Sequence, residues 1–400
     1  MTTTESLWPI DPITDAEYAA RTDAVRRAAE SEQLDAIIAY STAKIVANVR
    51  YLTSYFTRFA GHQHTKDAGY YMFGACAALV PVEGEPLLRT DALWDIIRAK
   101  DMSKYADADG STQLGADLGR EIARRGLKRV GIDNWYLFPA RDYIALTAAA
   151  PDTEFVPTLA ISRVRAVKSP AELERIRRAE RIADAAAIAG MDAVAPGVTE
   201  YEVGLVAEET LRRLGDLETA GGCIISAGPN SATGSSLPTR EKVIQRGEWV
   251  LFDVLPRFDG YAGDIARMRA AGDPSDLSEE LRHLHAATVL MNEEVIKTVK
   301  AGVTAAQLNA VANAVAEQEG VAEYKIELVG HGTGLDIHDV PDYFYDETPL
   351  RVGETFTIEP CLLKAGVAGT RIEDVVTVEE DGCEVLTKAP KGLFAEEVVR

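Results

Sequence analysis

The sequence predicts an α/β domain over residues 1–160 and an α+β domain over residues 161–400 that contains an internal pseudo-two-fold repeat. Strand and helix signals alternate from Thr14 to Pro151, which is typical of a partly parallel sheet. Beyond this point long helices precede groups of short strands, and the tripeptide Gly-Val-Thr occurs twice, 105 residues apart. A chain of 400 residues is also too long for one ordinary hydrophobic core.

The elements of the first domain follow from hydrophobic periodicity and from the polar residues that separate the segments. We expect, in chain order, a helix over 15–33, a strand over 35–40, a strand over 70–82, a helix over 90–101, a helix over 114–127 and a strand over 129–135. This half has neither a GxGxxG nor a GxxxxGK[ST] motif, so it carries no nucleotide-binding fingerprint.

The second domain is predicted to begin with a well-capped helix. Ser169 and Glu172 form a capping box with proline at the first helical position, and the amphipathic pattern continues to Ile188. Capping signals also follow the two Gly-Val-Thr stretches, at Thr199 and at Thr304. Each stretch lies between two helical segments, which is what an internal duplication predicts.

Two acidic residues flank a strong hairpin signal in the first repeat. Asp253 and Asp264 are equally far from the turn at 257–260, which ends in Asp-Gly. Opposed residues of an antiparallel pair share a face, so the two carboxylates are predicted to face each other. Their neighbours are apolar, and an unpaired buried carboxylate is costly.

The second repeat contains a similar pair. Glu359 and Glu373 are equally far from Gly366, and His331 precedes them in a glycine-rich stretch. Four carboxylates and one imidazole form an oxygen-rich ligand set that suits two divalent cations such as Mn, Fe, Co or Zn, and no thiolates of a structural zinc site accompany them. If each repeat supplies half of this set, the metal site lies at their junction.

Composition excludes several classes of function. The net charge of −21 argues against a nucleic-acid surface. No apolar run approaches the ~20 residues of a membrane helix, and the start of the chain lacks the pattern of a signal peptide. We therefore expect a cytoplasmic protein without a nucleic-acid or membrane partner. The 4 cysteines are scattered and are read as reduced core residues.

Several motifs resemble the "pita-bread" metallopeptidase family M24, in its creatinase, prolidase and aminopeptidase P branch. They are RAVKSPAEL (165–173), SAGPN (226–230), HGTGLDIHD (331–339), TIEP (357–360) and RIED (371–374). The resemblance is strong from Phe155 to Phe394 and weaker in the first domain, where NVRYLT (48–53) carries it. It implies a creatinase/prolidase-like N-terminal domain and a pita-bread catalytic domain.

The resemblance also implies roles for individual residues. Two divalent ions, with manganese as the first expectation and Fe, Co or Zn as alternatives, would be bound by Asp253, Asp264, His331, Glu359 and Glu373, with Asp264 and Glu373 as bridges. In such enzymes a metal-bridging hydroxide attacks an amide carbon. Glu359 resembles the proton shuttle, His338 a histidine that binds substrate, and Arg371 an arginine that supports the ligands.

One departure from the family pattern concerns the stretch after SAGPN. The family has a histidine within about ten residues of this motif, whereas this chain has none, and Ser235 occupies the position that we align with it. A positioned acid or base contributes ~10²–10⁴ in rate, so the loss of this histidine would be severe for an ordinary proline peptidase.

The resemblance as a whole implies a metal-dependent hydrolase of the Xaa-Pro dipeptidase/creatinase type that cleaves a C–N bond in a dipeptide or small amide. The alternatives are a lyase resembling the dimethylsulfoniopropionate lyases and a non-catalytic binding scaffold.

Other residues are candidates to line the substrate pocket. In this branch the first domain of one subunit often reaches over the site of its partner in a homodimer, which would bring His62, His64 and Trp94 there. Tyr343 could wall the same pocket. The alternatives are a polar loop for the two histidines and an exposed aromatic rim for Tyr343.

Overall fold

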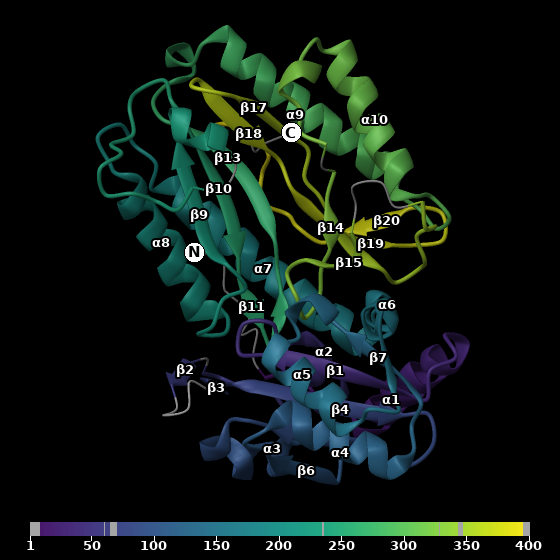
Figure 1. The fold of residues 1–400 in the computed structure, drawn as a ribbon. Helices are drawn as coiled ribbons and strands as arrows, with labels where there is room; N and C mark the ends of the chain where they lie inside the picture. Colours follow the sequence, from purple (N-terminus) through teal and green to yellow (C-terminus); the bar gives the residue numbers. More distant parts are fainter. Residues whose placement is uncertain are drawn as a thin grey trace. The chain divides into compact units, whose positions relative to one another are not determined.

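The structure, a computed structural model, describes residues 9–59, 61–64, 70–233, 236–327, 329–342 and 347–394. The chain divides into two compact units (Figure 1). The first unit is Ile10–Arg165, and the second begins at Ala166 and also includes Pro9. Within the described ranges, no helix is both long enough and apolar enough to span a membrane.

The first unit is built on a six-stranded mixed sheet. Across the sheet the strands are β6 (Asp107–Gly110), β5 (Leu87–Thr90), β4 (Ala75–Pro81), β1 (Ala36–Thr42), β7 (Arg129–Asp133) and β8 (Glu154–Thr158). β4 is antiparallel to both of its neighbours, and the other pairs are parallel. The partly parallel α/β organisation predicted for this half is therefore confirmed. A separate hairpin pairs β2 (Gly61–His64) with β3 (Tyr70–Phe73).

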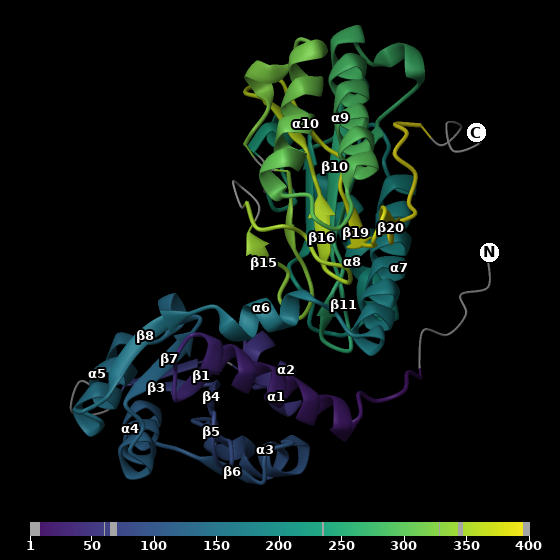
Figure 2. The same ribbon diagram turned by 90° about the vertical axis from the view of Figure 1, so that its right-hand side faces the viewer.

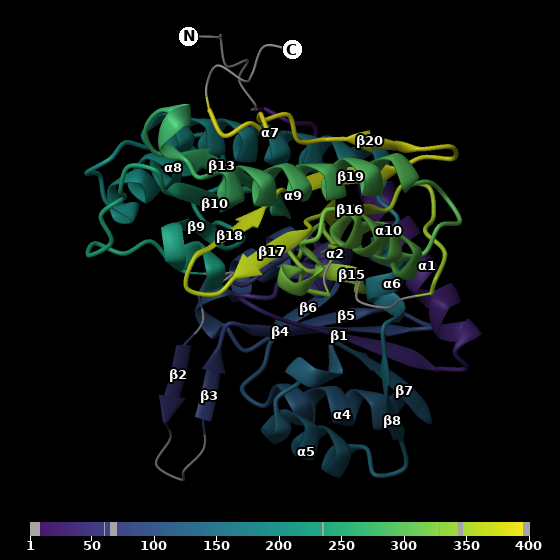
Figure 3. The same ribbon diagram turned by 90° about the horizontal axis from the view of Figure 1, so that it is seen from above.

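Helices cover both faces of this sheet. They are α1 (Asp15–Ser31), α2 (Ala47–Thr53), α3 (Ile96–Met102), α4 (Leu114–Arg125), α5 (Ala140–Ala149) and α6 (Ala160–Ala166). α4 and α5 lie on one face and α1 and α2 on the other (Figures 1 and 3). Leu118, Ile122 and Leu146 of the first pair bury against the side chains of β1 and β4. Strands and helices alternate because each apolar sheet face needs a helical cover.

The second unit contains two similar halves, each with two helices followed by strands. The first repeat comprises α7 (Pro170–Asp192), α8 (Glu200–Leu214), β9 (Gly222–Ala227), β10 (Trp249–Leu255) and β13 (Ile265–Ala270), with β11 (Arg257–Phe258) and β12 (Tyr261–Ala262) at the hairpin tip. The second comprises α9 (Glu279–Thr298), α10 (Ala305–Gln318), β14 (His331–Gly332), β15 (Asp339–Asp342), β16 (Thr355–Ile358), β17 (Cys361–Lys364), β18 (Ala368–Arg371), β19 (Asp374–Val378) and β20 (Cys383–Val385). The capping boxes predicted at Ser169, Thr199 and Thr304 are all confirmed.

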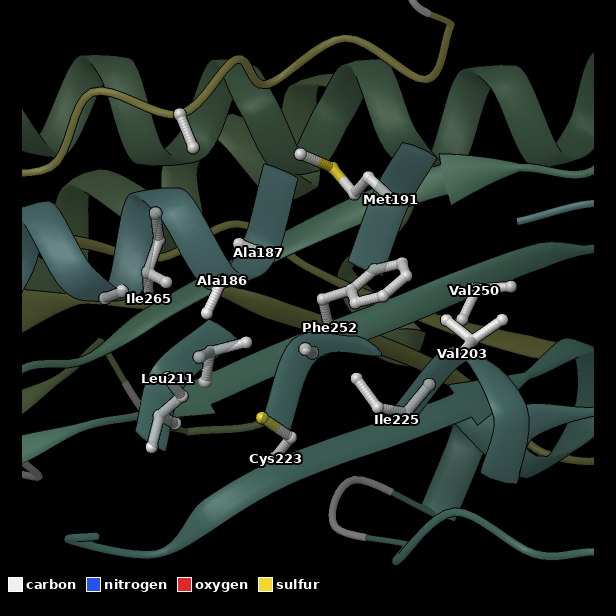
Figure 4. Packing of buried hydrophobic residues seen from close by; sticks show 14 of the residues in the cluster. Ala186, Ala187, Met191, Val203, Leu211, Cys223, Ile225, Val250, Phe252 and Ile265 are labelled. Carbon is white, nitrogen blue, oxygen red and sulfur yellow. The ribbon is translucent and has the colours of Figure 1, made fainter. Parts of the chain in front are cut away.

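Each helix pair packs on the strands of its own repeat. In the first, α7 and α8 bury Met191 and Val203 against Ile225 and Phe252 of β9 and β10 (Figure 4). α7 approaches closely because Gly190 has no side chain: a Cβ there would lie 2.7 Å from the Phe252 ring. In the second, α9 and α10 lie side by side over β16 and β19 (Figure 2). Asp253 lies on the face of β10 opposite Phe252, and the other candidate ligands lie at or beside the ends of strands.

Candidate metal centre

The aspartate hairpin forms, but its register differs from the prediction. Asp253 of β10 pairs with Ala266 of β13, two residues beyond Asp264. The turn consists of Asp259 and Gly260, both with positive φ (46° and 85°), which is typical of a type I′ turn. The expectation that Asp253 and Asp264 are directly opposed is therefore wrong, because it centred the turn one residue too early. A shift of two residues preserves the face of a strand, so the two carboxylates still approach each other.

The glutamate hairpin has the predicted register. Ile358 pairs with Asp374 and Cys361 with Arg371, so the strands are symmetric about Gly366, as expected. Glu359 and Glu373 lie between these two pairs, at the points where β16 gives way to β17 and β18 to β19. The backbone N–H of Glu373 also donates to Ala266 O at 3.0 Å. This bond joins the strands of the two repeats next to the candidate ligands.

Four of the five predicted ligands lie close together: Asp264, Glu359 and Glu373 from the hairpins, and His331 from β14. One ligand atom from each of Asp264, His331 and Glu373 lies within 4.8 Å of the others, and all three residues are buried. His331 Nε2 lies 3.6 Å from Asp264 Oδ2 and 3.4 Å from Glu359 Oε1. Asp253 is connected to this group through Arg371, whose Nη1 donates to Asp253 Oδ2 at 2.5 Å. No ligand side chain is more than 9% exposed.

Several carboxylate oxygens of this cluster have no hydrogen-bond donor among the described residues. Among the described residues, Asp253 Oδ1, Asp264 Oδ1 and Glu373 Oε1 are buried and accept no hydrogen bond. Burial, followed by repulsion from neighbouring carboxylates, raises the pKa of Asp264 and of Glu373 well above the usual range. Several buried carboxylate oxygens without donors are too costly to retain unless a cation compensates them. Hard oxygen donors with one imidazole fit Mn, Fe, Co or Zn.

His331 and Arg371 have contacts that orient the cluster. His331 Nδ1 lies 3.1 Å from Gly332 O, and an N–H donated to this carbonyl leaves the lone pair on Nε2, which faces the carboxylates. Arg371 Nε donates to Cys361 Sγ at 2.9 Å and lies 3.7 Å from Glu359 Oε2. His338 is exposed, and its ring lies beside that of His331, with 3.9 Å between the ring centroids and an interplanar angle of 53°.

Comparison with known proteins identifies the family. Residues 174–380 match Metallopeptidase family M24, and residues 21–167 match the Creatinase/Prolidase N-terminal domain. The chain belongs to metallopeptidase family M24. It is therefore a metallohydrolase, and family membership implies bound divalent metal. The resemblance and the fold class predicted from the sequence, including the pita-bread domain, are confirmed.

Individual M24 relatives cover most of the chain. The Xaa-Pro dipeptidase of Lactobacillus delbrueckii subsp. lactis is 32% identical over 337 residues, which are 82% of this chain and 86% of the relative. The Xaa-Pro dipeptidase of Lactobacillus helveticus is 31% identical over 85% of this chain and 91% of its own length. Among solved structures, the Xaa-Pro dipeptidase from Bacillus anthracis has a TM-score of 0.81 at 25% identity and covers 94% of this chain and 99% of its own. The prolidase from Pyrococcus horikoshii has a TM-score of 0.79 at 25% identity, over 94% and 100%.

The structure does not test the residues predicted to bind substrate in this M24 site. Ser235 and Tyr343 lie outside the described residues. His62 and His64 lie on β2, where the backbone alone is described. Trp94 belongs to the first unit, where it is 55% exposed, and its ring centroid lies 6.1 Å from that of Phe59. Their roles stay predictions.

Two buried polar residues behind the ligands were missed by the sequence reasoning. Glu180 of α7 accepts the backbone N–H of Asp264, and Asn292 of α9 donates to Ile358 O and Ile372 O, each next to a glutamate ligand. A signal was present, because Glu180 interrupts the apolar stripe formed by Ile176, Ala183 and Ala187. A lone polar residue in a helix is usually read as a solvent-facing one.

Proposed function

We propose that this M24 hydrolase is an Xaa-Pro dipeptidase that uses two divalent metal ions, with manganese as the first expectation. The observation that carries the proposal is the buried cluster whose oxygens Asp253 Oδ1, Asp264 Oδ1 and Glu373 Oε1 have no donors among the described residues. Relatives named Xaa-Pro dipeptidase match the chain over 86% and 91% of their own lengths, which supports the substrate class.

The residues that would hold the ions are those predicted from the sequence. Asp264 and Glu373 would bridge the two ions, with Asp253, His331 and Glu359 as further ligands. Bound divalent ions in such a site polarise a substrate carbonyl and lower the pKa of water to near neutrality. The assignment is supported by the ligand atoms of Asp264, His331 and Glu373, which lie within 4.8 Å of one another, and by the burial of all five residues.

Ligand orientation, proton transfer and substrate binding would be carried out by side chains of the protein. Arg371 orients Asp253 and Glu359 from one side, while Thr357 Oγ1 lies 3.5 Å from Glu359 Oε1 on the other. Glu359 Oε1 would accept a proton from the attacking water and pass it to the departing amine, as a general base and then a general acid. His338 is the exposed polar ring beside His331, and we assign it to hydrogen bonding with the substrate.

The alternatives have less support. The relatives do not favour a lyase, and the full set of candidate ligands argues against a scaffold. Ser235 in place of the usual histidine predicts slow cleavage compared with a histidine-containing enzyme. A homodimer, a cytoplasmic location and the contribution of His62, His64, Trp94 and Tyr343 to the pocket belong to the same proposal.

The test is metal analysis followed by turnover. The purified protein should contain about two divalent ions per chain, and its Mn-, Fe- and Zn-loaded forms should cleave Ala-Pro and Gly-Pro faster than Ala-Ala. Metal with no cleavage of either prolyl dipeptide would contradict the substrate class and direct the screen to creatine, ectoine and dimethylsulfoniopropionate. Absence of bound metal after reloading would contradict the proposed metal centre.

A further inference from the structure

Asp264 lies at a break in its strand. β12 ends at Ala262 and β13 begins at Ile265, so residues 263 and 264 are outside the ladder. The backbone here packs directly on α7: a Cβ on Gly263 would lie 2.8 Å from the carbonyl carbon and oxygen of Ala179. Gly263 N still donates to Pro256 O across the hairpin at 3.1 Å, but the N–H of Asp264 has no strand partner. A contact from outside the hairpin is therefore needed to hold the Asp264 backbone.

Glu180 of α7 provides that contact. Its carboxylate oxygens lie 3.2 and 3.3 Å from the backbone nitrogen of Asp264, which donates to both. The Glu180 side chain is fully buried, so it holds a single arrangement without competition from water. A buried acid at this helix position costs stability relative to an apolar residue of similar volume. If the position served packing alone, an apolar residue would fill it at lower cost.

We propose that Glu180 is a positioning residue of the metal centre, which holds the 263–264 backbone so that the Asp264 carboxylate is directed at the metal ions. This inference rests on the proposed assignment of Asp264 as a bridging ligand. Residues that orient a metal ligand typically contribute 10–100-fold in metal affinity or activity. Aspartate is the shorter of the two acidic ligand types, so its carboxylate depends closely on where its backbone is held.

The same helix offers a matched control. Asp184 lies one turn beyond Glu180 and is also buried, and its carboxylate accepts the backbone N–H groups of Lys388 and Ala389 at 2.6–2.9 Å. It therefore has the same chemistry on the same helix, but it binds a segment that carries no candidate ligand. A purely structural effect of losing a buried acid should appear in both variants.

The experiment compares Glu180→Leu with Asp184→Leu in the full-length protein. Metal is removed with chelator, and the dissociation constant for Mn is measured by titration calorimetry, together with metal content after dialysis, kcat and KM. Glu180→Leu should raise the dissociation constant ~10–100-fold. Glu180→Gln retains an acceptor oxygen and should restore most of the affinity. Asp184→Leu should lower Tm without changing the dissociation constant.

A second variant guards against misfolding. Glu180→Asp keeps the charge but is too short to reach the Asp264 nitrogen, so it should weaken metal binding in a folded protein. An unchanged dissociation constant in folded Glu180→Leu or Glu180→Asp would overturn the inference, while metal binding by the wild type would leave the proposed function intact. Loss of affinity in Asp184→Leu equal to that in Glu180→Leu would also overturn it. A wild type that binds no metal would instead refute the proposed function, and this inference with it.

Discussion

The turns that precede the second helix of each repeat have the same hydrogen bonds. In the first repeat, Gly197 N donates to Ile244 O at 2.9 Å and Ile244 N to Val198 O at 2.8 Å. In the second, Gly302 N donates to Leu350 O at 2.9 Å and Leu350 N to Val303 O at 2.8 Å. Both glycines have positive φ, and a capping box follows each turn. The two repeats therefore share a backbone frame.

The side chains that support the candidate ligands differ between the repeats. In the first repeat a carboxylate, Glu180, holds a backbone N–H. In the second, the amide of Asn292 binds two backbone carbonyls, Ile358 O at 2.9 Å and Ile372 O at 3.4 Å. The difference follows from the backbone around the ligands. Asp264 lies at a strand break, so its N–H has no strand partner and needs an acceptor. The glutamates lie where two hairpin strands change partners, and the carbonyls next to them accept from an amide. The backbone frame is duplicated, but the buried polar residue next to the candidate ligands differs between the repeats.

The largest expected effect comes from removing one bridging ligand of either repeat. Asp264→Ala and Glu373→Ala should each abolish bound metal and activity together, a larger loss than the ~10–100-fold that loss of a supporting residue costs. Metal content and kcat/KM measure the outcome. Asp216→Ala is the control, because Asp216 binds the backbone of Asp259 and Gly260 at the same hairpin and no ligand. Full turnover with retained metal in either ligand variant would contradict the two-metal arrangement.

Much of this arrangement was predictable because it depends on local rules. Capping boxes predicted the starts of α7, α8 and α10, and the repeated Gly-Val-Thr indicated the duplication. The symmetry about Gly366 predicted the glutamate register, because a short hairpin leaves few alternatives. The four acidic candidate ligands were predicted because acidic residues in apolar strands need compensation.

Other features depend on contacts that spacing does not encode. The turn at Asp259 and Gly260 shifted the aspartate register by two residues, since both positions adopt positive φ. The strand break before Ile265 depends on the packing of Gly263 against α7, a long-range contact. Glu180 and Asn292 were missed for the same reason: their partners are backbone groups 84 and 66 residues away.

The second-repeat counterpart of the Glu180 experiment is Asn292→Leu. This variant leaves Ile358 O without its donor and Lys391 Nζ without an acceptor that lies 2.7 Å away, so it should cost about 1–3 kcal/mol of stability. If the amide positions both glutamates, Mn affinity should also fall by ~10-fold or more. Denaturant unfolding and calorimetry measure the two effects.

Asn309→Leu is the matched control for this prediction. Asn309, on α10, is also buried, and it accepts from Lys325 Nζ at 3.0 Å, but its own amide donates to Glu327 and not to a ligand strand. It should lose stability and keep metal affinity. Equal metal affinity in both variants would show that the second repeat holds its ligands without help from α9.

A smaller effect is expected at a position where the repeats differ outright. Glu200 opens α8, whereas Ala305 opens α10, and both are buried. The Glu200 carboxylate accepts from Ala227 N (2.7 Å) and Asn230 Nδ2 (3.0 Å) within the SAGPN motif and from Thr239 N (3.1 Å) and Oγ1 (3.0 Å) after the loop that follows it. Glu200→Gln removes one acceptor oxygen and should cost about 1–3 kcal/mol in unfolding free energy.

The same variant tests whether this loop serves the substrate. Glu200→Gln should raise KM for Ala-Pro several-fold and leave Mn affinity unchanged, because no candidate ligand lies on the loop. Glu202→Gln is the control: Glu202 is on the same helix, but its carboxylate accepts the backbone N–H of Thr199 at 2.9 Å as part of the capping box. An unchanged KM in Glu200→Gln would assign the loop a structural role.

The last effect is absent at neutral pH and appears only in acid. It concerns His285, which lies 105 residues after Glu180 and corresponds to it in the repeat. His285 is buried, its Nε2 lies 2.9 Å from Lys391 O, and burial lowers the pKa of its imidazole to about 4. The unfolded chain binds a proton near pH 6.5 and the folded chain only near pH 4, so stability falls as pH decreases through this window. The loss reaches about 3 kcal/mol at the low end. His285→Gln should remove this part of the acid sensitivity and leave stability at pH 8 within about 1 kcal/mol of wild type.

The comparison requires that other acid effects be subtracted. Protonation of the metal ligands also destabilises the holoenzyme in acid, so unfolding free energies are measured on metal-free protein between pH 4 and pH 8. His283→Gln is the control, since His283 lies two residues earlier on α9 with an exposed side chain and should keep the wild-type pH profile. If His285→Gln and wild type lose stability in parallel as pH falls, the buried imidazole is not the group that titrates. In that case the position corresponding to Glu180 in the second repeat would serve packing alone.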